Sequence, residues 1–250
     1  MKILLRNILT NVKETADPRN LPYCVFEIFR FMGDYFKYRK RYHAFYPLRL
    51  SPIFYERTNK SRFDPHYAYQ AYWATKRIVS ERLPKMHLDI SSSVTFITQL
   101  CGILPVVHLE YRPPSVMLSS YKGIRGDIGH LPFKSGSVES LSCLHVIEHV
   151  GLGRYGDCLD VDACWNAMRE LERVVISGGR FLMTVPVGKP AVYFNANIVF
   201  AAEDIVTAMK GLQLREFSLV RDDGTYVENA SLAQAADMSY ALGMFDFRRV

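Results

Sequence analysis

The sequence lacks the long apolar runs and the cysteine spacings that define several classes of protein. None of its 250 residues lies in a run close to the roughly 18 apolar residues that a membrane-spanning helix needs. Five cysteines without any Cys-x-x-Cys pair argue against a disulfide framework and against a cysteine zinc site. The opening segment MKILLRNILTN, interrupted by Arg6, is not expected to be a secretory signal. We therefore expect a reducing, cytoplasmic compartment.

Acidic residues are scarce in the first 60 positions, which hold 5 Asp and Glu against 12 Lys and Arg. The remaining 190 positions hold 20 acidic and 19 basic residues, so they are close to neutral. The net charge of +6 therefore belongs to the N-terminal segment. No nucleic-acid-binding motif accompanies this charge, so a nucleic-acid partner is not expected.

Aromatic residues are concentrated in the same region, with 17 of 32 between Tyr23 and Trp73. A helix is predicted where Phe26, Phe29, Met32 and Phe36 recur at helical spacing, and a basic run follows it. A second predicted helix, from Tyr67 to Leu83, stops at Pro84. Two interpretations stay open. The aromatic stripe packs on the next domain as a helical cap, or residues 23–60 contact an anionic membrane or an acidic partner.

From residue 85 onward, short apolar strands alternate with helical stretches, which is typical of a doubly wound parallel sheet. We expect an α/β, Rossmann-like domain over residues 85–250 with a mostly parallel seven-stranded sheet. Residues 1–84 form an aromatic, basic helical extension in this interpretation. Strands are predicted at 86–90, 106–110, 138–144, 180–187, 214–220 and 244–250, and a weaker strand is predicted to end at residue 127. A predicted helix precedes Gly178-Gly179 and is closed by these glycines.

Polar residues stand where these predicted strands end, and a parallel sheet binds ligands beyond the carboxyl ends of its strands. They are Asp89, Glu110, Asp127 and the cluster His145, Glu148 and His149. Because both faces of such a sheet are buried, solvated surface alone explains these acids poorly. The structural alternative for Glu110 and Asp127 is helix capping or surface solvation, and Asp89 could simply cap the next helix.

In order and spacing these features resemble the class I S-adenosylmethionine-dependent methyltransferases, in a branch similar to methyltransferase type 11, over residues 85–250. Glu110 follows Asp89 by 21 positions, as the acid of the second strand does in that family. The other matching segments are Leu88–Ser93, Asp127–Phe133, Glu148–Val150, Gly178-Gly179, Val185-Pro186 and the final MFDFRRV.

The resemblance implies an S-adenosylmethionine cofactor and methyl transfer. Glu110 would accept hydrogen bonds from the ribose hydroxyls, as acids do in dinucleotide folds. Asp127, with Ile128 beside it, would take the adenine amino group. The loop of Asp89, with Ser91 and Ser93, would lie near the methionine end of the cofactor.

The chain departs from the family at this loop, where Ser91, Ser93 and Thr95 replace the usual glycines. Glycine permits positive φ and close approach of the backbone, which serine permits less readily. A serine hydroxyl could compensate through a hydrogen bond. The alternative function is a methyltransferase-fold binding or scaffold protein that has lost its cofactor.

The sequence His145-Val146-Ile147-Glu148-His149 also matches the H-x-x-E-H pattern of zinc peptidases. That pattern needs a long helix, whereas Gly151 and Gly153 follow immediately. The ubiquinone-pathway O-methyltransferases look similar here and imply a divalent cation held by the cluster, or His149 as general base. In the purely structural alternative, His149 satisfies a loop carbonyl and Glu148 caps a turn.

The acceptor is expected to be an oxygen of a small molecule or a glycan. Arg154 and Tyr155 lie in a glycine-rich segment, 151–157, which is interpreted as a mobile flap over the acceptor. Asn195 follows the fifth strand, where this fold often places acceptor groups. Loop contacts without a functional role are the alternative for all three residues.

Overall fold

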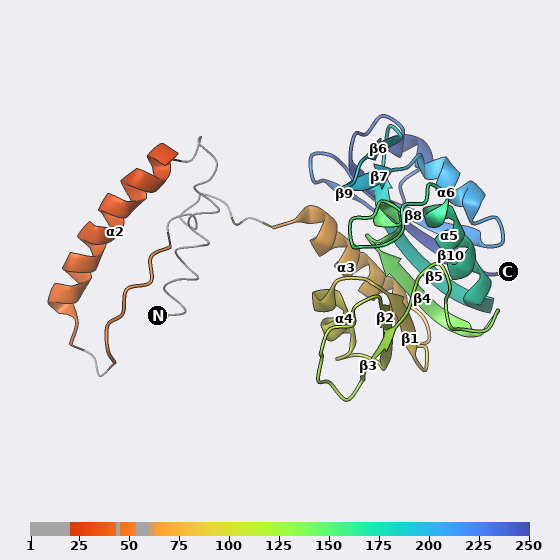
Figure 1. The fold of residues 1–250 in the computed structure, drawn as a ribbon, viewed down its shortest axis with the longest axis horizontal. Coiled ribbons are helices and arrows are strands. Elements are labelled where there is room, and N and C mark those ends of the chain that lie inside the picture. Colours follow the sequence, from red (N-terminus) through yellow and green to blue (C-terminus); the bar gives the residue numbers. More distant parts are fainter. Residues whose placement is uncertain (1–20, 44–45, 54–60, 62) are drawn as a thin grey trace. The chain divides into compact units, whose positions relative to one another are not determined.

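The computed structural model describes residues 21–43, 46–53, 61 and 63–250 (Figure 1). The chain forms two compact units, Met1–Phe63 and Asp64–Val250. The second unit therefore begins 21 residues before the predicted boundary at 84/85, because helix α3 (Pro65–Val79) belongs to it.

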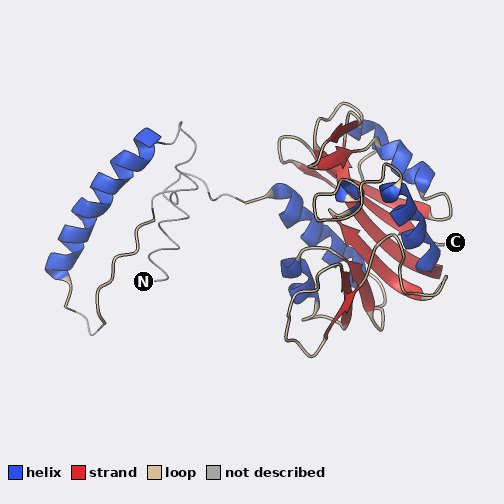
Figure 2. Cartoon of the chain, in the orientation of Figure 1, coloured by secondary structure: helices blue, strands red, loops and turns tan. Residues whose placement is uncertain are grey.

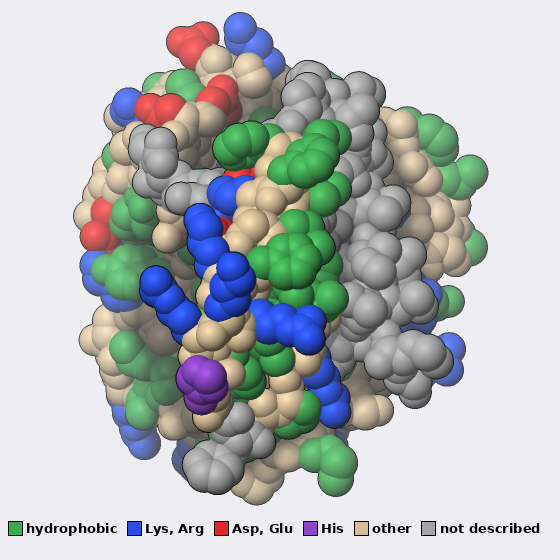
Figure 3. All heavy atoms as spheres, turned by 90° about the vertical axis from the view of Figure 1, so that its left-hand side faces the viewer, with side chains coloured by type: hydrophobic (Ala, Val, Ile, Leu, Met, Phe, Trp, Pro, Cys, Tyr) green, Lys and Arg blue, Asp and Glu red, His purple; other side chains and the backbone are tan. Residues whose placement is uncertain are grey.

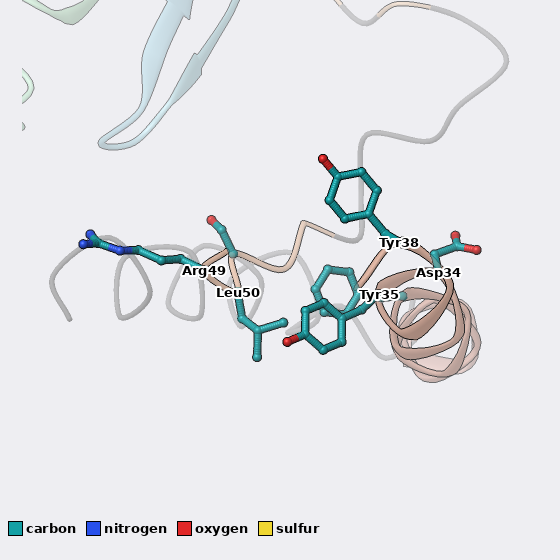
Figure 4. Close-up of a pocket in the computed structure, with 7 residues that line it drawn as sticks. Asp34, Tyr35, Tyr38, Arg49 and Leu50 are labelled. Atoms are coloured by element: carbon teal, nitrogen blue, oxygen red, sulfur yellow. The ribbon is translucent and has the colours of Figure 1, made fainter. Parts of the chain in front are cut away.

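The N-terminal unit contains helix α2 (Leu21–Arg41), in agreement with the spacing of its aromatic residues. Glu27 is buried and pairs with Arg30, whose guanidinium also lies 3.3 Å from a carboxylate oxygen of Asp34. A shallow hollow of about 370 Å³ separates this helix from the segment 49–51, and Tyr35 and Leu50 both line it (Figure 4). Among the described helices, none combines the length and the apolar character needed to cross a bilayer.

The second unit is built on one eight-stranded sheet in the order β3-β2-β1-β4-β5-β10-β8-β9 (Figure 2). Strands β3, β2, β1, β4 and β5 are parallel, and β10 is antiparallel to both β5 and β8. The bounds are β1 His87–Ile90, β2 Val106–Glu110, β3 Tyr121–Arg125, β4 Val138–Leu144, β5 Val175–Val187, β8 Gln213–Val220, β9 Tyr226–Val227 and β10 Ala241–Arg248.

The mostly parallel, doubly wound architecture is confirmed, with one strand more than predicted. The additional strand is β9, which has two residues and pairs antiparallel with β8. A separate hairpin joins β6 (Ala191–Tyr193) to β7 (Asn197–Val199).

Helices cover both faces of the sheet. Helices α3 and α4 (Val94–Leu100) share one buried apolar cluster with the sheet, whereas α5 (Ala163–Val174) and α6 (Ala202–Ala208) share the other. Two 3-10 helices complete the unit, η2 (Ile147–His149) and η3 (Leu232–Ala235).

Helix α3 is fixed to the sheet by apolar and polar contacts together. Trp73 is fully buried and donates a hydrogen bond from Nε1 to Glu216 Oε2 at 2.9 Å. Arg77 lies 2.8 Å from the same carboxylate oxygen, and Ile78 is buried in the cluster beneath the helix. A buried carboxylate is stable only when such partners surround it. These contacts explain why α3 belongs to the sheet domain rather than to the N-terminal unit.

The two glycines predicted to close a helix instead lie inside strand β5. Helix α5 ends at Val174, and β5 begins at once at Val175. Gly178 has φ of +75°, near a shift of register between β4 and β5. A Cβ on Gly179 would lie 2.7 Å from the Ile176 carbonyl oxygen, so only glycine fits there. The glycine pair therefore forms an irregularity within a strand and not a helix stop.

Candidate active site

A cavity of about 860 Å³ lies beyond the carboxyl ends of the parallel strands, within the size range of cofactor and ligand sites. Loops after four different strands contribute to it. Of the residues singled out in the sequence, those that line it are Ser91, Glu110, Asp127, Ile128, His145, His149 and Tyr155. Those that do not are Asp89, Ser93, Glu148, Arg154 and Asn195.

Glu110 and Asp127 meet at this cavity because β2 and β3 are parallel neighbours that end at the same edge. Glu110 Oε1 accepts a hydrogen bond from the backbone N–H of Arg112 at 3.2 Å. Asp127 Oδ1 accepts one from the N–H of Gly129 at 2.8 Å. Each carboxylate thus organises its own loop with one oxygen, and two anionic groups border a single cavity.

Ser91 has the backbone conformation that glycine usually provides, with φ of +55°. Its N–H donates to the carbonyl oxygen of Leu109 at 2.9 Å, and its hydroxyl donates to the same oxygen at 3.3 Å. The serine therefore keeps the left-handed turn and places its hydroxyl against strand β2. Whether this arrangement compensates for the missing glycine in cofactor binding stays a prediction.

Asp89 is fully buried and does not reach the cavity, contrary to the predicted cofactor contact. Its Oδ1 accepts from the N–H of Ser92 at 3.0 Å, and its Oδ2 accepts from the hydroxyl of Ser142. Burial raises the pKa of Asp89, against the opposing effects of His108 and of these two serines. The carboxylate consequently joins β1 to β4 and holds the turn that contains Ser91.

Ser93 is also absent from the cavity lining. Its side chain caps helix α4 by accepting a hydrogen bond from the N–H of Phe96 at 3.4 Å. Serine commonly has this capping role at a helix start, and the predicted role of Ser93 in cofactor binding stays a prediction.

Glu148 and His149 follow strand β4 in the short helix η2. Glu148 is fully buried, and one of its carboxylate oxygens, Oε1, lies 3.7 Å from His149 Nε2. The Nδ1 of His149 lies 2.7 Å from the carbonyl oxygen of Ala196, so this nitrogen must carry the hydrogen. In the neutral ring, Nε2 then has the lone pair that a general base needs.

His145 precedes this helix and contacts the same carboxylate from the other side. Its φ is +62°, and its Nδ1 hydrogen-bonds to Glu148 Oε1. Since a carboxylate only accepts, Nδ1 of His145 is the donor and Nε2 has the lone pair. Glu148 therefore fixes the ring orientation of His145 and lies close to His149.

The sequence analysis missed three aromatic residues beside His145. His66 Nδ1 lies 3.4 Å from His145 Nε2, and the His66 ring stacks on Tyr240 with centroids 5.5 Å apart. Tyr67 stacks on His145 at 5.4 Å. Burial, together with the neighbouring His145, lowers the pKa of His66. The signal available in the sequence was Asp64-Pro65, a typical helix start, which places His66 and Tyr67 in the first turn of α3.

His145, Glu148 and His149 have potential metal-ligand atoms within 4.8 Å of one another. The second oxygen of Glu148, Oε2, is buried without a hydrogen-bond partner in the described part of the chain. The divalent cation expected from the sequence stays a prediction. The zinc-peptidase arrangement does not fit, because η2 has only three residues and cannot present two histidines on one face of a long helix.

The glycine-rich segment 151–157 is organised around the carboxylate of Asp157. Its oxygens accept from the N–H groups of Gly151 at 2.9 Å, Gly153 at 3.2 Å and Tyr155 at 3.1 Å. Burial raises the pKa of Asp157, but these hydrogen bonds outweigh burial and leave that pKa lowered. Tyr155 consequently has a defined place in the cavity wall.

The other two proposed acceptor contacts lie outside the cavity lining. Arg154 is exposed and donates to the carbonyl oxygen of Ala196 at 2.9 Å, with its guanidinium 5.2 Å from the ring centre of Tyr155. Asn195 is exposed in the loop between β6 and β7. Arg154 therefore supports the loop that orients His149.

The mostly parallel sheet, with antiparallel β10 between β5 and β8, gives this chain the same fold as solved S-adenosylmethionine-dependent methyltransferases. N-methyltransferase NodS from Bradyrhizobium japonicum WM9, solved with S-adenosyl-L-homocysteine, superimposes with a TM-score of 0.55 at 13% identity, over 74% of this chain and 88% of its own.

Two further structures of this fold belong to enzymes with different named activities. Geranyl diphosphate C-methyltransferase from Streptomyces coelicolor A3(2) matches with a TM-score of 0.51 at 11% identity, over 73% of this chain and 79% of its own. SpnF, a [4+2]-cyclase, matches with a TM-score of 0.52 at 12% identity, over 73% of this chain and 80% of its own. At such identities the likeness establishes the fold, and activity must be argued from the site.

A family model described as "Caenorhabditis protein of unknown function, DUF268" matches residues 134–242, which is less than half of the chain. The match begins just before β4 and ends within β10, so it contains the histidine cluster. A search of curated proteins finds no match to this sequence.

Proposed function

We propose that this protein transfers a methyl group from S-adenosylmethionine to an oxygen of a small-molecule or glycan acceptor. One observation carries the proposal: two carboxylates, Glu110 and Asp127, border the same cavity as the imidazole of His149. Anionic groups suit the hydroxyls and the amino group of an adenosine, and the imidazole suits proton removal from an acceptor hydroxyl.

The cavity residues fit the cofactor that the fold implies. Glu110 would accept hydrogen bonds from the ribose hydroxyls, and Asp127 would accept one from the adenine amino group. Ser91 keeps the backbone of the first loop in the conformation that allows close approach. When bound, the cofactor supplies an electrophilic methyl group on a sulfonium.

The proton of the acceptor hydroxyl would pass to Nε2 of His149 as the oxygen attacks. The carbonyl oxygen of Ala196 holds the opposite nitrogen, Nδ1, so the lone pair on Nε2 has a fixed direction. The carboxylate of Glu148, 3.7 Å from Nε2, would stabilise the imidazolium that results. Orientation of the acceptor would supply most of the remaining rate, as in other reactions between two bound groups.

The aromatic wall of the site supports a cyclic acceptor. Tyr155 lines the cavity with a ring and a hydroxyl, and it contacts His149 edge-on with ring centroids 5.8 Å apart. Flat apolar faces beside hydrogen-bonding groups suit a sugar or a phenol. Both choices agree with transfer to oxygen.

Thermal unfolding with S-adenosylmethionine and its demethylated product tests the cofactor assignment. At about 100 times Kd, the ligand should stabilise the native state by about 2.7 kcal/mol, which corresponds to about 5–10 °C for a domain of this size. Glu110→Gln should remove most of the shift, whereas Glu139→Gln, an exposed position on β4, should retain it. No shift at millimolar ligand for the wild-type protein, with none for Ser91→Gly either, would refute the proposal.

A binding or scaffold protein without the cofactor is the second candidate, favoured by the serines in the first loop. Ser91→Gly separates the two. A thermal shift that appears or increases in Ser91→Gly identifies an enzyme with a weakened cofactor site. A response that is absent in both proteins supports the scaffold function. Ser93→Gly is the matched control, because that side chain caps α4 and lies outside the cavity.

A further inference from the structure

Helix α2 of the N-terminal unit exposes a continuous stripe of apolar side chains. We define the apolar stripe as Val25, Phe29, Met32 and Phe36, which recur at spacings of four, three and four residues. These side chains are between 39% and 74% exposed. Residues at such spacings share one face of a helix, so the stripe is a single surface and not scattered exposure.

Basic residues border the stripe at the C-terminal end of the helix. We define the basic group as Lys37, Arg39, Lys40 and Arg41, all of them exposed. The two acidic residues of α2, Glu27 and Asp34, both form ion pairs with Arg30. These ion pairs do not involve the basic group. Figure 3 shows Lys and Arg side chains beside hydrophobic ones on this side of the molecule.

Contacts within the N-terminal unit use another side of α2. Phe31 and Tyr35, one turn apart, both line the hollow, and Figure 4 shows Tyr35 on the helix side of it and Leu50 on the other. Both are less exposed than the members of the apolar stripe that follow them in sequence, Met32 and Phe36. The packing of the unit therefore leaves the apolar stripe facing water.

We propose that α2 lies in the plane of an anionic lipid surface, with the apolar stripe among the acyl chains and the basic group at the headgroup phosphates. Charge alone would fit any polyanion, but the exposed phenylalanines gain free energy only where they leave water. An apolar stripe flanked by Lys and Arg is the arrangement of interfacial amphipathic helices. The long basic side chains can reach the phosphates while their stems stay apolar.

Sedimentation of the full chain with vesicles tests this proposal. We expect binding to phosphatidylcholine vesicles that contain about one third phosphatidylserine, weak binding to pure phosphatidylcholine, and release by salt. Equal binding to both vesicle types, or none to either, would overturn it. Retention on polyglutamate without vesicle binding would likewise overturn it, because the basic group would then bind an acidic macromolecule and not a lipid surface.

Two double variants separate the apolar and the electrostatic contributions to vesicle binding. Phe29→Ser with Phe36→Ser should weaken binding to anionic vesicles by about tenfold or more. Lys37→Gln with Lys40→Gln should weaken it by about fivefold for each charge and remove part of the salt dependence. Met117→Ser, a change at a highly exposed apolar residue of the second unit, is the matched control and should have no effect.

A tryptophan placed on α2 reports insertion even if a double variant disturbs the unit. Phe29→Trp should show a blue shift on anionic vesicles and quenching by brominated acyl chains. Tyr38→Trp, at an exposed residue that lines the hollow, should show neither. Trp73 and Trp165 contribute the same background to both proteins. Identical spectra for the two variants would contradict an inserted apolar stripe.

Discussion

The imidazoles of His66 and His145 lie 3.4 Å apart, Nδ1 to Nε2, although 79 positions separate them in the sequence. Because Glu148 accepts the hydrogen bond from Nδ1 of His145, the lone pair on Nε2 of His145 faces Nδ1 of His66 and can accept a hydrogen bond from it. Glu148, His145 and His66 thus form a chain of hydrogen bonds that runs from the buried end of η2 to the first turn of α3.

His66→Phe should lower turnover without changing cofactor binding. The phenyl ring can keep the stacking on Tyr240, but it cannot donate to His145. Loss of one hydrogen bond of about 1 kcal/mol predicts a decrease in kcat of about fivefold. Steady-state kinetics with separate kcat and KM values measure it, and Tyr72→Phe on the exposed side of α3 is the control. Unchanged kcat in His66→Phe, with kcat lost in His145→Ala, would show that His66 has no positioning role.

His149→Gln should abolish most of the methyl transfer while leaving the cofactor-induced thermal shift intact. A general base contributes about 10² to 10⁴ in rate, and an amide cannot replace it. Product formation and thermal shift, measured on the same preparation, separate the two effects. His43→Gln, at an exposed histidine of the N-terminal unit, should behave as wild type. If His149→Gln retains full activity, another group removes the proton.

Acid should destabilise the second unit through His87. This imidazole is buried between the hydroxyls of Ser140 and Ser142, each 2.8 Å from a ring nitrogen. Burial lowers the pKa of His87 to about 3 in the folded protein, whereas the unfolded chain has about 6.5. Between these values only the unfolded state binds the proton, so the free energy of unfolding falls as the pH drops below 6.5.

Urea unfolding at pH 7 and pH 5 should therefore differ by about 2 kcal/mol from this residue. His87→Asn should reduce the difference, since asparagine keeps hydrogen bonding and does not titrate. Asp89 shares Ser142 and has a raised pKa, which acts in the opposite sense, but it is present in both proteins. Parallel pH profiles for the two proteins would contradict this assignment.

A chain that begins at Asp64 should fold, whereas a chain that begins at Lys85 should not. The shorter chain lacks Trp73 and Ile78, which are buried against the sheet, and leaves Glu216 without two of its partners. Removing one buried aromatic side chain alone costs about 3–5 kcal/mol. Circular dichroism and thermal unfolding of both chains measure the difference. Cooperative unfolding of the chain from Lys85 would restore the predicted boundary.

The strands and the convergence of Glu110 and Asp127 were predictable, because alternation of strands and helices implies a parallel sheet whose carboxyl ends share an edge. The buried position of Asp89 could also have been predicted from the sequence. Side chains two apart in a strand share a face, so Asp89 lies on the same buried face of the sheet as His87 and not in the cavity wall.

The contribution of α3 to the site could not be predicted, because it depends on pairings far apart in the sequence. Trp73 finds its partner Glu216 143 positions later, and no local pattern specifies that contact. An aromatic stripe at helical spacing has the same appearance whether it packs on a domain, as Trp73 does, or faces solvent, as Phe29 does. Only the three-dimensional structure separates α3 from α2.

Asp64 is both the first residue of the compact sheet unit and the cap of α3, since its carboxylate accepts from the N–H groups of His66 and Tyr67. A proteolytic cut just before it would leave the helix start intact. A cut just after it would fray the first turn and displace both rings from His145, while the sheet stayed folded. One residue at this junction thus decides whether the rings of His66 and Tyr67 keep their places beside His145.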